Sequence, residues 1–243
     1  MPGEQIILVG AAASVGVVHT LIGPDHYLPF ITLARARNWS LARTVGVTML
    51  SGLGHVAGSV LLGFLGLALG WALGGLERFE AMRGEIAGWL LLAFGIAYLV
   101  WGLRQAYKAR PHSHRHSHAD GTVHLHRHSH RGEHSHLHDA GAGLETKSLL
   151  KGATAWSIFI IFVLGPCEPL IPLLVYPAAS GRSLGIVIVV AVFALTTVAT
   201  MTTLVVIGRA GLERLPAARW ERWSHAVAGA IIAACGLAMQ FGL

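Results

Sequence analysis

Long apolar stretches dominate this chain and restrict it to folds that a membrane can hold. A helix needs about 20 apolar residues to cross the hydrocarbon layer, and six stretches approach or exceed that length, at 5–22, 44–73, 86–104, 153–179, 183–208 and 225–242. Only 12% of the residues are charged and 53% are hydrophobic, whereas soluble domains carry about 25% charged residues. We therefore predict an all-α integral membrane protein with six transmembrane helices, located in the inner membrane.

Two similar proline motifs interrupt these stretches. GPDHYLP occupies 23–29, and GPCEPLIP occupies 165–172. Proline removes a backbone donor, and glycine loosens the turn before it. In a bilayer, the backbone groups freed in this way are tolerated only inside protein or beside a water-filled cavity. We therefore predict broken helices at both motifs; the alternative is a simple kink or a helix end near the membrane surface.

The two halves of the chain resemble each other beyond these motifs. NWSLARTV at 38–45 is similar to GRSLGIVI at 181–188, and GLERF at 75–79 is similar to GLERL at 211–215. Each half contains three apolar stretches, so the second half must enter the membrane from the opposite side. This pattern predicts two inverted three-helix repeats, a transporter architecture. We place the first repeat at 1–107, a central loop at 108–150 and the second repeat at 151–243.

The distribution of Lys and Arg predicts the orientation. Fifteen of the 18 Lys and Arg residues lie in the first, third and fifth connections, and such connections face the cytoplasm. Both termini are then expected outside. The first stretch begins with MPGEQ and lacks a basic segment, so we do not expect a signal peptide. The formal net charge of +6 follows from these membrane flanks, and no nucleic-acid partner is predicted.

Polar residues that could bind a metal ion gather at the two motifs and in the adjoining spans. The candidate ligands are His19, Asp25, His26, His55, Cys167 and Glu168. Imidazole and carboxylate, with one thiolate, form a ligand set for Ni, Co, Zn or Cu, and ionisable residues within a membrane are usually functional. A single membrane histidine is more often a packing residue. The combination of six such groups favours a shared cation site at the repeat interface.

The central loop is rich in histidine. The segment 112–138 contains eleven histidines and reads HSHRHSHADGTVHLHRHSHRGEHSHLH. We predict that His112, His114, His116, His118, His124, His126, His128, His130, His134, His136 and His138 bind metal in a disordered cytoplasmic loop that buffers or senses the ion. The alternative is a neutral low-complexity expansion.

Three features of the sequence together resemble the nickel/cobalt permease families, including the NicO and UreH-like branches. They are the six spans, the histidine-rich loop and the early pattern of His19 followed by Asp25-His26. In those families four residues separate a histidine from the Asp-His pair, whereas five residues separate His19 from Asp25 here. The resemblance implies a transporter of Ni²⁺ or Co²⁺, with Zn²⁺ as a further candidate, and assigns His26, Asp25 and His55 to the ion site.

Other transporters on three-plus-three scaffolds are alternatives. GPCEPLIPLL resembles the motif of thiol-disulfide transporters, which need a cysteine in each repeat, but Asp25 stands where a partner of Cys167 would lie. Exporters of small anions or amino acids of the TauE and LysE type are a third class. No nucleotide-binding GxxxxGK[ST] motif occurs, and no resident cofactor or enzymatic activity is expected. The sequence indicates neither a metallochaperone partner nor an oligomeric state.

Overall fold

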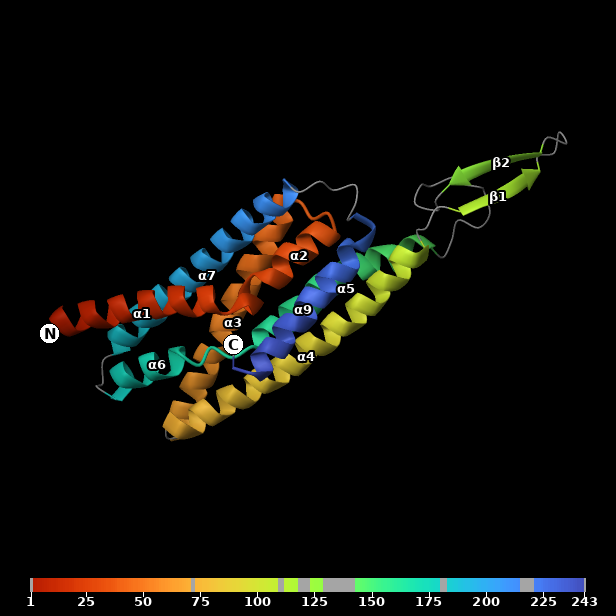
Figure 1. Cartoon of the computed structure of the whole chain (residues 1–243). Helices are drawn as coiled ribbons and strands as arrows, with labels where there is room; N and C mark the ends of the chain where they lie inside the picture. The colour runs from red at the N-terminus through yellow and green to blue at the C-terminus, as the bar shows by residue number, and fades with distance from the viewer. Residues whose placement is uncertain are drawn as a thin grey trace.

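A computed structural model describes residues 2–70, 73–108, 112–117, 123–128, 143–179, 183–214 and 221–242. The first half contains α1 (Pro2–Ile22), the short η1 (Pro24–His26), α2 (Leu28–Ala36), α3 (Leu41–Ala68) and α4 (Leu73–Lys108). The second half contains α5 (Gly143–Leu164), α6 (Leu170–Ala179), α7 (Ser183–Glu213), the short η2 (Glu221–Trp223) and α9 (Ser224–Gln240). The bundle that these helices form is shown in Figure 1, and the predicted helical membrane architecture is confirmed in this coarse form.

Five helices of the described chain are long and apolar enough to cross a membrane. They are α1, α3, α4, α7 and the segment formed by η2 and α9. The remaining predicted span, 153–179, is divided between α5 and α6 at the second proline motif. The described apolar part of α5, Ala153–Leu164, is shorter than a full span. The structure therefore yields five clear candidates where the sequence predicts six.

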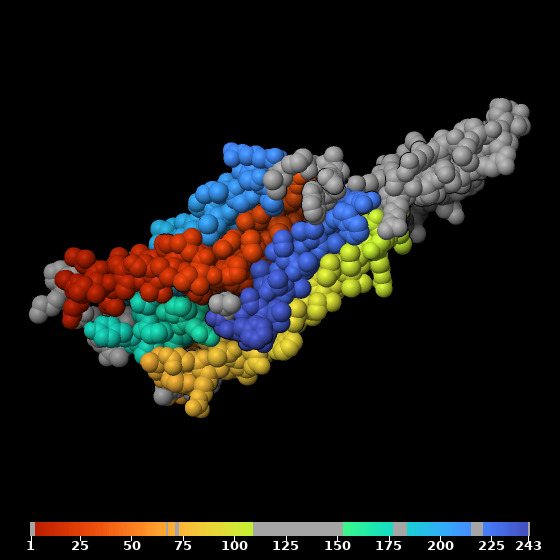
Figure 2. Space-filling view, viewed as in Figure 1, coloured from red at the N-terminus to blue at the C-terminus, as the bar shows by residue number. Residues whose placement is uncertain are grey.

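Both halves have the same order of elements: a helix, a break, a short helix and two long helices. In Figure 1 the interrupted helix α1–α2 runs opposite to its counterpart α5–α6, and α3 runs opposite to α7. The contacts between the halves are also symmetric. Helix α1 packs on α7, and its counterpart α5 packs on α3, the counterpart of α7. On the face of the molecule shown in Figure 2, α1 lies between α7 and α6.

Helix α9 packs along most of its length against the second half of α4. Glycines allow this close approach, since a Cβ atom on Gly95 would overlap the backbone of Ala233, and one on Gly229 would overlap the backbone of Leu99. Small residues at helix contacts are typical of membrane bundles, in which van der Waals packing drives association.

The outside of the bundle is apolar, and its interior holds polar side chains among the apolar ones. Ile6, Leu61 and Leu195 are all more than 70% exposed, whereas the buried set includes hydroxyl, imidazole and carboxylate side chains. In water, an exposed apolar surface of this extent would be unfavourable. The arrangement suits a protein whose surroundings are lipid, and it explains why the polar residues of the long helices face inward.

Two short parts of the segment that was predicted to be a disordered histidine-rich loop lie within the described residues. Residues His112–Ser117 (β1) and Val123–His128 (β2) form a two-stranded antiparallel sheet. Histidine stands opposite histidine at three positions of its register: His112 with His128, His114 with His126 and His116 with His124. The histidines at 118, 130, 134, 136 and 138 lie outside the described residues.

Candidate metal centre

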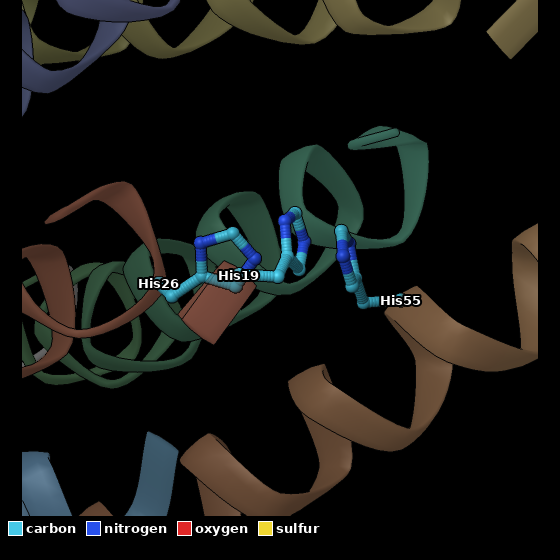
Figure 3. Close-up of side chains that lie close together, drawn as sticks. All are labelled: His19, His26 and His55. Carbon is cyan, nitrogen blue, oxygen red and sulfur yellow. The ribbon is translucent and has the colours of Figure 1, made fainter. Parts of the chain in front are cut away.

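Three histidines from three elements meet at the first break. His19 comes from α1, His26 from η1 and His55 from α3. One ligand atom from each ring lies within 4.8 Å of the others. His26 and His55 are 3% and 2% exposed, and His19 is half-buried. Figure 3 shows the three imidazoles gathered in one place.

Hydrogen bonds determine which ring nitrogens are available. His26 Nδ1 lies 3.2 Å from the Gly23 carbonyl oxygen, and His55 Nδ1 lies 3.1 Å from that of Phe162. Because a carbonyl oxygen only accepts, each Nδ1 must carry the proton and donate. In the neutral ring this leaves the lone pair on Nε2. The Nε2 atoms of all three histidines are buried and have no partner among the described residues.

Asp25 supports this arrangement from the side. Its Oδ1 atom lies 3.2 Å from His26 Nδ1, and its side chain is 14% exposed. The ring N–H of His26 is thus shared between a carboxylate and a carbonyl oxygen. Metal-binding histidines commonly donate their second N–H to such groups, which orients the ring and makes its free nitrogen more basic. Asp25 therefore lies beside the three-histidine group and is outside it.

The local sequence explains the position of His26. Gly23 and Pro24 end α1, and the chain turns through η1 with the His26 amide donating to the Gly23 carbonyl at 3.1 Å. A Cβ atom on Gly23 would lie 2.5 Å from His26 Nδ1. Only glycine leaves room there for the imidazole to fold back against the backbone. The GPDH motif therefore places the ring beside His19, which lies one helical turn before the break.

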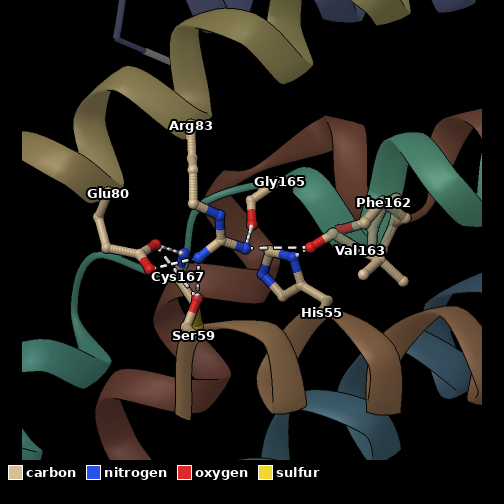
Figure 4. A network of polar contacts seen from close by, with 8 residues as sticks. All are labelled: His55, Ser59, Glu80, Arg83, Phe162, Val163, Gly165 and Cys167. Carbon is tan, nitrogen blue, oxygen red and sulfur yellow. Dashed lines mark hydrogen bonds and ion pairs between the residues drawn. The ribbon is translucent and has the colours of Figure 1, made fainter. Parts of the chain in front are cut away.

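The second break is held by a buried ion pair that the sequence did not indicate. Glu80 and Arg83 on α4 form a salt bridge, and Glu80 is fully buried. Arg83 donates to the carbonyl oxygens of Val163 at 3.0 Å and Gly165 at 3.1 Å. Glu80 accepts from the Cys167 amide at 3.1 Å. Figure 4 shows how these contacts satisfy the backbone groups that the break leaves unpaired at the end of α5.

His55 belongs to the same structural unit. It donates to the Phe162 carbonyl oxygen, the neighbour of the carbonyl groups that Arg83 binds. Ser59, one turn further along α3, donates to Glu80 at 3.1 Å. The end of α5 therefore orients His55, while α4 orients the end of α5. The halves of the chain depend on each other at this point.

Two of the predicted ligands lie elsewhere. Cys167 is buried in an apolar cluster with Leu170 and Phe193. Glu168 is exposed at the wall of a cavity. Among the described residues, neither belongs to the group of converging ligand atoms. Residue type and position in a repeat suggested both residues, and Glu168 lines the same cavity as His19 and His26.

A cavity of about 690 Å³ leads to the histidines from one side. His19, Asp25 and His26 line its inner part, and the further carboxylates Glu85 and Glu168 also line it. No Lys or Arg is among the lining residues. Three carboxylates without a compensating cation in the lining give the cavity a negative field, which attracts cations and repels anions.

The opposite side of the histidine group is apolar. The Phe162 ring lies 5.7 Å from the His26 ring and 5.3 Å from the His55 ring, measured between centroids. Phe30 packs against Phe162 at 5.0 Å and is fully buried. The cavity therefore ends at the histidines in this conformation.

The residues present fit a divalent transition-metal ion. A tetrahedral ion with metal–nitrogen bonds of about 2.1 Å holds its ligand atoms about 3.4 Å apart, so small ring rotations would bring the three nitrogens into range. Imidazole nitrogens favour Zn, Cu, Fe and Ni over Mg or Ca. Three unpartnered Nε2 atoms would leave one or more coordination positions open to water or to a further ligand.

The comparisons of this chain with protein-family models, with curated proteins and with solved structures found no match.

Proposed function

We propose that this protein transports divalent transition-metal ions, Ni²⁺ or Co²⁺ first among them, across the membrane. The ion would bind His19, His26 and His55, with Asp25 orienting His26. The observation that carries the proposal is the convergence of three imidazoles whose buried Nε2 atoms have no partner among the described residues. A buried polar atom without a partner costs about 1–3 kcal/mol, and a bound cation would remove that cost at all three atoms together.

The fold supports movement of the ion as well as its binding. The opposed directions of the two halves fit inverted repeats, in which substrate sites lie at broken helices between the halves. The cavity gives access from the side of Glu85 and Glu168, which the charge distribution predicts to be extracytoplasmic. Rocking of one half against the other would move the end of α5 relative to His55, and so expose the ion to the other side.

The alternatives have less support. An anion exporter would need cations at its substrate cavity, yet the lining contains carboxylates and no Lys or Arg. A thiol-disulfide transporter would need two cysteines that meet, but Cys167 and Cys235 are free and lie in different apolar clusters.

The histidine-rich hairpin would be a second metal-binding element on the cytoplasmic side. Its three histidine pairs occupy directly opposite positions of the backbone register. Weak, interchangeable ligands of this kind suit the holding or sensing of ions. Deletion of 112–138 should reduce the number of weakly bound ions while leaving the tight site intact.

The test is the substitution His26→Ala in the full chain, reconstituted in lipid vesicles. We expect the tight binding of Co²⁺ or Ni²⁺, measured by calorimetry and by the Co²⁺ absorption spectrum, to weaken by about 100-fold or more, since even outer-shell changes cost up to about 100-fold. Flux of the ion into the vesicles should be lost with it.

His225→Ala is the matched control, because His225 is a histidine outside the group and hydrogen-bonds Tyr98 at 2.9 Å. It should bind and transport as the wild type does. Repeating both measurements without 112–138 separates the tight site from the loop. Unchanged Ni²⁺, Co²⁺ and Zn²⁺ binding and flux in His26→Ala would refute the proposal.

A further inference from the structure

Unpartnered buried polar atoms in the described chain fall into two groups. The first comprises the Nε2 atoms of the three histidines. The second consists of four hydroxyl oxygens on the facing helices α3 and α7, those of Thr48, Ser51, Thr197 and Thr202. The two helices pack closely, since a Cβ atom on Gly52 would lie 3.2 Å from the Met201 sulfur. The second group has no role in ion binding as described above.

The α3 hydroxyls form a stripe that ends at the metal centre. Thr44, Thr48, Ser51 and His55 are spaced by four, three and four residues, which puts them on one face of the helix. Thr44, Thr48 and Ser51 are fully buried. At 1.5 Å per residue, Ser51 lies about 6 Å, Thr48 about 10 Å and Thr44 about 16 Å from His55 along the axis. We call these three residues the α3 hydroxyl stripe.

The conformations of Thr48 and Ser51 are unusual for helical hydroxyls. Helical Ser and Thr commonly donate to the carbonyl four residues earlier. Thr20, Thr32, Thr44, Ser157 and Thr196 all do so here, at 2.8–2.9 Å. Thr48 and Ser51 make no such bond, so their oxygens remain available to a ligand in the interior.

The stripe leads away from the cavity. Thr44 is near the start of α3, whereas the cavity is lined by Ala81, Gly84 and Glu85 in the first half of α4, the helix that follows the end of α3. Figure 1 shows these two regions at opposite ends of α3. At the far end Arg209 donates to Thr44 Oγ1 at 2.9 Å and pairs with Glu213 at 2.8 Å. Glu213 is about half exposed, so the stripe reaches the surface at an ion pair.

We infer that Thr48 and Ser51 line the second half of the ion's route, from His55 to the Thr44–Arg209 end, and that their hydroxyl oxygens bind the ion's water shell. The inference rests on the proposed function and adds the residues of the exit side. Uncharged oxygens would rehydrate a departing cation without holding it as tightly as imidazole does. In this conformation Phe162 and Arg209 close the two ends of this second half of the route.

The experiment compares Thr48→Val/Ser51→Ala with wild type in vesicles, using Co²⁺ as the probe. The hydroxyls act after binding, so we expect Co²⁺ affinity within about 2-fold of wild type and a flux at least 10-fold lower. The control Thr196→Val/Ser157→Ala removes the same atoms from hydroxyls that bond their own helix, and its flux should equal that of wild type. Thr48→Ser/Ser51→Thr keeps both oxygens and should retain flux, which separates loss of hydroxyls from misfolding.

Wild-type flux in Thr48→Val/Ser51→Ala would overturn the inference and leave the proposed function standing. A tenfold loss of Co²⁺ affinity in that variant would also overturn it, because the hydroxyls would then belong to the binding site. If the wild type itself neither binds nor moves Co²⁺, Ni²⁺ or Zn²⁺, the proposed function fails, and the inference fails with it.

Discussion

Glu80 shows how one carboxylate can determine the geometry of a distant site. It is fully buried, pairs with Arg83 and accepts the amide of Cys167, 87 residues away in the chain. The pair fixes the end of α5, and that end orients His55. The Glu80–Arg83 pair is thus a positioning element for the candidate metal centre and lies outside the three-histidine group.

Glu80→Gln should strongly destabilise the protein. It leaves the largely buried Arg83 guanidinium without its counter-charge, and breaking a buried pair in this way costs about 3 kcal/mol or more. Thermal unfolding in detergent should show a lower transition temperature. The double variant Glu80→Gln/Arg83→Met should recover part of the loss, because no unpaired charge remains. Equal stability of Glu80→Gln and wild type would contradict this account of the break.

At the scale of elements, the glycine-lined contact of α4 with α9 joins the two halves. Gly95→Ala should force these helices apart, because the added Cβ atom would lie 2.6 Å from the Ala233 Cα atom. Overpacking of this kind costs about 1–3 kcal/mol, which thermal unfolding would detect.

Gly46→Ala is the control for that measurement. Gly46 lies on an exposed part of α3, and a Cβ atom there would meet nothing within 4 Å. Alanine is the better helix former by about 1 kcal/mol, so this variant should be as stable as wild type or more stable. A stable Gly95→Ala variant would mean that the two helices are less closely packed than described.

At the scale of the whole molecule, the number of spans determines where the termini lie. Six spans put both termini on one side of the membrane, whereas five put them on opposite sides. The Lys and Arg distribution predicts that both are outside. Alkaline phosphatase fused to either end should therefore be active, and green fluorescent protein fused to either end should be dark. Opposite results at the two ends would show that α5–α6 does not complete a crossing.

The helical class, the apolar helices long enough to cross a membrane, and the breaks at the two proline motifs could be predicted from sequence. These features are properties of short segments. A bilayer fixes the apolar length that a span needs, and it restricts where proline and glycine can interrupt a helix. The same reasoning selected His19 and His55, because an ionisable group in an apolar span is rare.

The convergence of those histidines, and the exclusion of Cys167 and Glu168 from their group, required the tertiary structure. His55 lies 36 residues after His19, and only the packing of α3 against the first break and the end of α5 brings the rings together. The role of Arg83 also required the tertiary structure, because its carbonyl partners lie about 80 residues away in the chain. A short segment shows which atoms can bind a cation, but the distances between those atoms depend on how separate helices pack.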